Sequence, residues 1–151
     1  MPRIYYILLF FSFSCLFAEM WDPDPSAGPI SANWNDPSNW LPEIVPNSNS
    51  ATATFGNIAS GPLNAVLNTQ IGVNTLEFNS NSSYRITGSN QLNVSFQIEV
   101  APNTPATSIE APVVFDLAGA VLNNSTSTFT LNDLTGGGII QLDGTGKIFS
   151  Q

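Results

Sequence analysis

Ten residues decide the fold class of this chain: QLNVSFQIEV, residues 91–100. Every second side chain in this stretch is apolar, and the residues between them are polar. Successive side chains of a β-strand point to opposite faces, so this alternation predicts a strand with one apolar face. The apolar series comprises Leu92, Val94, Phe96, Ile98 and Val100.

Similar short segments lie on both sides of this strand. VNTLEF and SYRIT precede it, and VVF and FTL follow it. Tracts rich in turn-forming residues separate them, among them NSNSS, TGSN, APNTP and DGTG. Strands that recur every ~8–12 residues between such turns are typical of an all-β chain. No amphipathic helix is expected in this part of the sequence.

Two all-β architectures fit this pattern. A β-sandwich fits in roughly 100 residues, and so does a parallel β-helix, in which the chain winds as stacked coils. The strands are short, their turns are rich in Asn, Gly, Ser and Thr, and only 9% of residues are charged. These properties favour strands that pair on both sides. We therefore expect a parallel β-helix, with the β-sandwich as the alternative.

The N-terminal residues 1–18 have the anatomy of a secretory signal peptide. Arg3 precedes an unbroken apolar run from Ile4 to Phe13, and small residues follow. The run is shorter than the ~20 apolar residues that span a bilayer. We expect cleavage after Ala18, and lipidation at Cys15 is the alternative. Either outcome directs the chain out of the cytoplasm.

Residues 19–49 are rich in Pro and Asn and contain all three tryptophans. The prolines exclude a regular helix, so we expect an irregular cap here and β-solenoid repeats over 50–151. Two roles are open for Trp21, Trp34 and Trp40. They are expected to plug one end of the core, and the alternative is a platform on which a sugar ring stacks.

The composition argues against several kinds of site. The chain has no His, one Cys and only 3 Lys+Arg, against 11 Asp+Glu, for a net charge of -8. We therefore expect no catalytic residues, no metal or other cofactor and no nucleic-acid binding. An enzyme would be indicated if Arg85 or Lys147 lay beside two carboxylates. The body's acids are scattered in the sequence: Glu77, Glu99, Glu110, Asp116, Asp133 and Asp143.

The sequence over residues 30–149 resembles bacterial autotransporter-type passenger domains with autotransporter-associated β-strand repeats. The shared order is Trp-Asn, Asn-Trp and Pro, then an Ala-Thr-Phe strand, then "v-n-s-l-x-F" and "y-x-i-x-G-x-x-L-x-v". The matching residues are Trp34, Asn35, Asn39, Trp40, Pro46, Ala53, Thr54, Phe55, Val73, Leu76, Phe78, Tyr84, Ile86, Gly88, Leu92 and Val94. This resemblance implies a right-handed β-helix exported to the cell surface, in which these positions are structural.

No segment for a translocator barrel follows Gln151 in this sequence. We therefore expect a passenger truncated at its C-terminus, a fragment of a longer protein, or a solenoid released by another route. The expected function is that of an exported, non-enzymatic, adhesin-like surface protein, secreted or at the outer membrane. A secreted carbohydrate-binding β-sandwich is the alternative.

The expected partners are glycans, host or cell-surface proteins, and further copies of the chain. Self-association is expected because the solenoid end after Phe149 carries unpaired strand edges. A missing downstream coil would cover the same edges. Contact with a membrane is expected only through export or through a missing C-terminal barrel.

Overall fold

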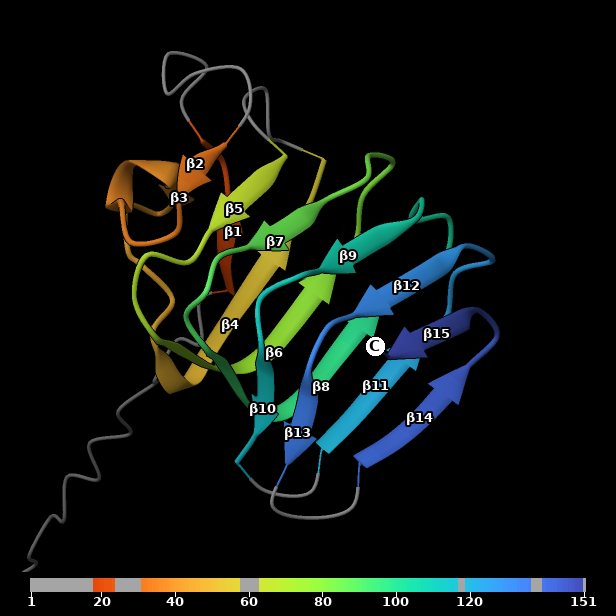
Figure 1. The fold of residues 1–151 in the computed structure, drawn as a ribbon. Helices are drawn as coiled ribbons and strands as arrows, with labels where there is room; N and C mark the ends of the chain where they lie inside the picture. Colours follow the sequence, from red (N-terminus) through yellow and green to blue (C-terminus); the bar gives the residue numbers. More distant parts are fainter. Residues whose placement is uncertain (1–17, 24–30, 58–62, 117–118, 137–139, 151) are drawn as a thin grey trace, which may run out of the picture.

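The computed structural model describes residues 18–23, 31–57, 63–116, 119–136 and 140–150, and these residues form two β-sheets (Figure 1). The larger sheet has nine strands and the smaller has six. The larger contains β1 (Ala18–Trp21), β3 (Trp40–Leu41), β4 (Ser48–Phe55), β6 (Ile71–Phe78), β8 (Leu92–Val100), β10 (Val113–Phe115), β11 (Gly119–Asn123), β13 (Leu134–Gly136) and β14 (Ile140–Gly144). The smaller contains β2 (Ala32–Asn33), β5 (Asn64–Val66), β7 (Arg85–Thr87), β9 (Thr107–Ile109), β12 (Thr128–Leu131) and β15 (Lys147–Ser150).

The chain alternates between the two sheets and moves along them by one strand with each coil. Ile71 lies opposite Leu92, Leu92 opposite Val113, and Val113 opposite Leu134, so each position meets its counterpart one coil later. Apart from β1 with β3, the described strand pairs are parallel. This arrangement is a parallel β-helix (Figure 1). It confirms the expected fold, and the sandwich alternative is wrong.

Alternating side chains fill the space between the sheets. In β6 and β8 the inward positions are fully buried, and in-register pairing stacks like residues in columns along the coil. Phe55 lies opposite Phe78, and their rings stack with centroids 5.2 Å apart. On the other side, Ala65, Ile86 and Ile109 form a buried column. The inner faces are buried because the two sheets pack against each other around one core, while each coil pairs with the next along its strand edges.

Phe96 does not follow the alternation that its sequence predicts. Val94 pairs with Val73 and Gln97 with Thr75, so two residues of β8 oppose the single Asn74. This β-bulge bends the strand and turns Phe96 outward, where its side chain is 57% exposed. The inward placement of Phe96 that the periodicity predicted is therefore wrong. In the next coil two separate strands face β8: β10 pairs with the part of β8 before the bulge, and β11 pairs with the part after it.

Gly88 lies in the turn after β7 with φ of 127°. A Cβ atom at this position would lie 2.5 Å from the carbonyl oxygen of Leu67 in the preceding coil. Both the backbone conformation and the close approach of the two coils therefore require glycine. The Asn90 side chain donates to the same carbonyl oxygen at 3.0 Å and satisfies it.

The described part of the N-terminal region before β4 contributes the short strands β1, β2 and β3 to the coil. β1 lies between β3 and β4 in the larger sheet and runs parallel to β4. A 3₁₀ turn, η2 (Pro37–Asn39), precedes β3, and the Asp36 side chain caps it by accepting from the Ser38 backbone N–H. The predicted signal peptide lies outside the described residues except for Ala18, which begins β1, and Cys15 also lies outside them.

Candidate functional site

The three tryptophans lie together at the N-terminal end of the coil. The centroid of the Trp40 ring lies 5.0 Å from that of Trp21 and 4.9 Å from that of Trp34, both in edge-to-face geometry. Phe55 extends the cluster into the next coil, 5.7 Å from Trp21. The order of the strands explains this arrangement. β1 supplies Trp21, β3 supplies Trp40, and Trp34 directly follows β2.

The tryptophan cluster is closed to solvent. Trp21 and Trp34 are 0% exposed and Trp40 is 2% exposed, so no indole face is open to a sugar ring. Trp34 Nε1 donates to the Pro46 carbonyl oxygen at 3.1 Å, and Trp40 Nε1 donates to the Trp34 carbonyl oxygen at 2.8 Å. Buried indoles with bonded N–H groups contribute packing energy. The geometry therefore supports the plug more than the stacking platform.

Glu77 and Glu99 are brought side by side by the coil. They lie directly opposite each other on β6 and β8, beside a surface hollow of about 170 Å³ that also reaches Asn79 and Ala101. Glu77 accepts from Thr54 Oγ1 at 3.2 Å, and Glu99 accepts from Gln97 Nε2 at 3.2 Å. Hydroxyl and amide donors thus offset part of the repulsion between two like charges. Their separation in the sequence is close to one coil, but it identifies the pair only once the register of the strands is known.

Arg85 binds one carboxylate. Its guanidinium donates from Nε and Nη2 to Glu110, with a shortest distance of 2.7 Å. These hydrogen bonds raise the pKa of Arg85 above its ordinary value. The two residues lie on neighbouring coils, with side chains about half exposed. The second acidic partner that would indicate an enzyme is not seen at Arg85 among the described residues.

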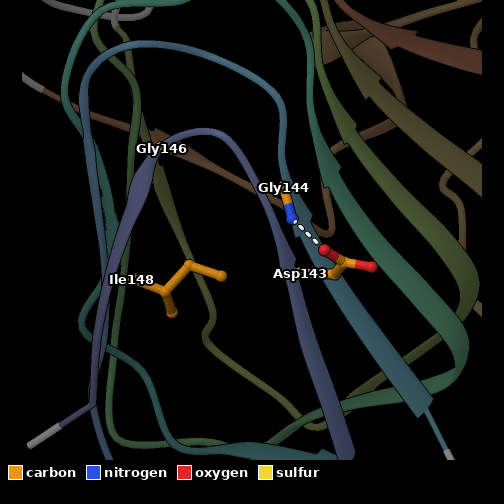
Figure 2. A pocket seen from close by; sticks show the side chains of 4 residues that line it. All are labelled: Asp143, Gly144, Gly146 and Ile148. Carbon is orange, nitrogen blue, oxygen red and sulfur yellow. Dashed lines mark hydrogen bonds between the residues drawn. The ribbon is translucent and has the colours of Figure 1, made fainter.

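A second hollow lies at the C-terminal end of the coil. It has a volume of about 270 Å³ and is lined by Asp143, Gly144, Gly146 and Ile148 (Figure 2). Asp143 Oδ1 accepts from the Gly144 backbone N–H at 2.7 Å. Ile148 packs against the core and forms the apolar wall. The sequence did not reveal this site, because a hollow at the end of a coil depends on which strands lack a neighbour.

Asn123 is a buried polar residue that the sequence did not distinguish from the many other asparagines. Its Nδ2 donates to the carbonyl oxygens of Ser127 and Lys147, at 3.0 and 2.9 Å. Its Oδ1 accepts from the backbone N–H and the hydroxyl of Ser125, at 3.2 and 2.7 Å. The amide is therefore saturated and contributes to structure, not to ligand binding.

Among the described residues, no three His, Cys, Asp or Glu side chains come close enough to hold a metal ion. Within the same ranges, no helix has the length and apolar content that crossing a membrane requires. Comparison with protein-family models, with curated proteins and with solved structures found no match to this chain. The role of the chain must therefore be inferred from the geometry of the coil.

Proposed function

We propose that this chain is an exported, non-enzymatic structural protein of the cell surface, with an adhesin-like role. The observation that carries the proposal is the in-register coil itself. Its apolar side chains form one internal core, and its outward positions carry polar residues at regular intervals. Such a coil stands without disulfides, because each turn is hydrogen-bonded to its neighbours along the axis.

The outer face of the larger sheet supports a role in contact with other molecules. Partly exposed carboxylates lie in register on neighbouring coils: Glu77 lies opposite Glu99, and the buried Thr54 donates its hydroxyl to Glu77. Groups of this kind hydrogen-bond to sugar hydroxyls and to polar protein surfaces. We infer that glycans or cell-surface proteins bind along this face, and that the buried tryptophans support the coil from inside.

The finer part of the proposal is that the chain forms the start of an autotransporter-like passenger. Its support is the ordered motif around Trp34, Trp40 and Phe55, whose residues form the N-terminal end of the coil. The apolar leader before Ala18 supports export.

The intact mass and cell fraction of the endogenous product test this proposal. A species in the outer membrane, longer than the 151 residues of this sequence, would support the passenger. A secreted species beginning near Glu19 would support an exported solenoid without that relationship. A cytoplasmic product that retains residues 1–18 would contradict export altogether.

A separate experiment tests adhesion. Beads coated with the purified protein should bind to host cells or a glycan array more strongly than beads coated with heat-unfolded protein. Glu77→Lys together with Glu99→Lys should reduce binding, because both replacements change the outer face and leave the core intact. Equal binding by folded and unfolded protein would contradict a role for the coil surface.

A further inference from the structure

Phe96 is a large aromatic side chain on the outer face of the larger sheet. It lies in the middle of β8, which has paired strands on both sides, and yet its side chain is 57% exposed. Every other apolar side chain of β8 is buried. The bulge opposite Asn74 turns this one ring outward. Bulges often redirect a side chain beside a functional site, so the ring is a candidate contact for a partner.

Carboxylates lie on both sides of the Phe96 ring along the strand. Asp116 is exposed in the next coil beside Ser95, and a long contact of 3.5 Å joins Ser95 Oγ to Asp116 Oδ2. Further along β8, Glu99 is partly exposed and lies opposite Glu77, beside the hollow of about 170 Å³. From Ser95 to Glu99 is four residues, which corresponds to about 13 Å along a strand. The ring therefore lies between two acidic groups.

The negative charge of this face has no basic partner in its own sheet. Within the part of the chain that the structure describes, the larger sheet contains neither Lys nor Arg. Arg85 and Lys147 lie on β7 and β15 of the smaller sheet, and Arg85 already pairs with a carboxylate there. The hydrogen bonds that Glu77, Glu99 and Asp116 accept come from hydroxyl and amide groups, which are neutral. The charge is therefore available to a partner.

We propose that this surface, the Phe96 face (Glu77, Phe96, Glu99 and Asp116), binds a basic, extended polypeptide segment. Carboxylates attract ammonium and guanidinium groups through charge-assisted hydrogen bonds, and an aromatic face attracts the same cations through its π electrons. A segment that runs along β8 with two basic residues four positions apart reaches Asp116 with one and Glu99 with the other. An apolar side chain between them covers the ring. This inference names a partner class for the outer face and rests on the adhesin-like role proposed above.

Charge favours this partner over a sugar. A neutral sugar could stack on Phe96 but would leave the carboxylates without opposite charge, and an acidic sugar would be repelled. The Phe96 face also lies alongside the axis of the coil. Coils that precede or follow the described ones extend the structure along that axis, so they would leave the face open.

An amide NMR titration of the isotope-labelled protein with two end-blocked peptides tests the inference. Lys-Thr-Leu-Thr-Lys carries its charges at the spacing of the two acidic sites, and Lys-Lys-Leu-Thr-Thr has the same composition with adjacent charges. We expect the spaced peptide to bind with a Kd lower by about threefold or more, and to bind less tightly as salt is added. The largest shifts should fall on the amides of Phe96, Glu99 and Asp116.

Variants of the protein test the contribution of each group. Phe96→Ser should raise the Kd of the spaced peptide by about threefold or more, because a central aromatic contact is lost. Ile44→Ser is its matched control, since Ile44 is 54% exposed and lies outside the Phe96 face. Asp116→Asn and Glu99→Gln should each raise the Kd and reduce its salt dependence. Glu43→Gln, on an exposed residue outside the face, is the control for charge.

Melting curves of all variants should superimpose, so that a raised Kd reports on binding and not on folding. Equal Kd values for the two peptides would overturn the proposal, because they would reflect only the general attraction of cations to an acidic protein. So would equal effects of Ile44→Ser and Phe96→Ser. Coated beads that bind cells while neither peptide binds would overturn this inference and leave the adhesin-like role standing. Preferential binding of the spaced peptide by a protein that does not adhere would support the Phe96 face and contradict adhesion.

Discussion

The side-chain amide of Asn123 donates to the carbonyl oxygen of Lys147, one coil further along, at 2.9 Å. Its other hydrogen bonds remain within its own coil, to Ser125 and Ser127. One buried side chain therefore fixes a turn and attaches the final described coil to the coil before it.

Replacing Asn123 should weaken this end of the coil strongly. Asn123→Ala leaves partly buried backbone carbonyl groups of two coils without this partner, at a cost of about 1–3 kcal/mol in the free energy of unfolding. Urea unfolding measures the change. Asn124→Ala is the matched control, because Asn124 makes one long contact of 3.4 Å to Glu99 and is only partly buried. Equal effects of the two replacements would contradict the bridging role of Asn123.

Trp34→Ala should destabilise the protein by about 3–5 kcal/mol, since it removes a buried indole and creates a cavity. The indole is fully buried at the N-terminal end of the coil. Thermal or urea unfolding measures the loss. Leu41→Ala in β3 is the control, and it should have little effect because Leu41 is 55% exposed. An unchanged melting temperature with lost glycan binding would instead support the stacking platform.

Alkaline pH should destabilise the protein through Tyr84. Burial raises the pKa of Tyr84, and the hydroxyl donates to the Gly56 carbonyl oxygen at 2.6 Å. The folded state therefore retains the phenolic proton more tightly than the unfolded state. This contribution to stability is complete below the unfolded pKa of about 10 and is lost as the pH rises through the folded value.

Tyr84→Phe should remove this part of the alkaline dependence, at a cost of roughly 1 kcal/mol at neutral pH from the lost hydrogen bond. A chain that begins at Glu19 contains Tyr84 as its single tyrosine, so tyrosinate absorbance reports on this residue alone. Titration at ordinary phenol pH in the folded protein would show that Tyr84 is accessible and would contradict its burial.

Phe96 and Ile98 provide a test of the bulge. Phe96→Ser should leave the free energy of unfolding nearly unchanged, because surface substitutions of this kind have small effects and the side chain lies outside the core. Ile98→Ala should cost about 2–5 kcal/mol, as is usual for a large side chain truncated in a core. Ile98 is fully buried. Chemical denaturation measures both changes, and a large loss for Phe96→Ser would place that ring inside the coil.

The alternation of β8 predicted the fold class correctly and one side chain incorrectly. The alternation of apolar and polar residues identifies the residues that share a face of the sheet, as long as the strand continues without an inserted residue. Leu92, Val94, Ile98 and Val100 keep the alternation on both sides of the bulge, and only Phe96, which lies within the bulge, departs from it. Its position depends on Asn74 in the neighbouring strand, so it could not be deduced from the strand's own sequence.

The side-chain contacts between neighbouring coils could not be predicted from the sequence either. Glu77 and Glu99, or Arg85 and Glu110, become neighbours only when the register is known. The length of the coil also varies, being shorter from Ile71 to its partner Leu92 than from Ile86 to its partner Ile109, and this variation obscures the repeat. The burial of the tryptophans could be predicted from the sequence, because large apolar rings in a short proline-rich segment need a core to cover them.

The in-register coil gains length slowly. Adjacent strands lie about 4.8 Å apart, so one whole coil advances the structure by only that distance. An α-helix of about 20 residues, close to the length of one coil, would extend about 30 Å. As a spacer this fold is therefore inefficient. It provides surface instead: each coil adds one more row of outward side chains at a fixed interval, so a bound polymer with a similar repeat would meet the same chemistry again at every step.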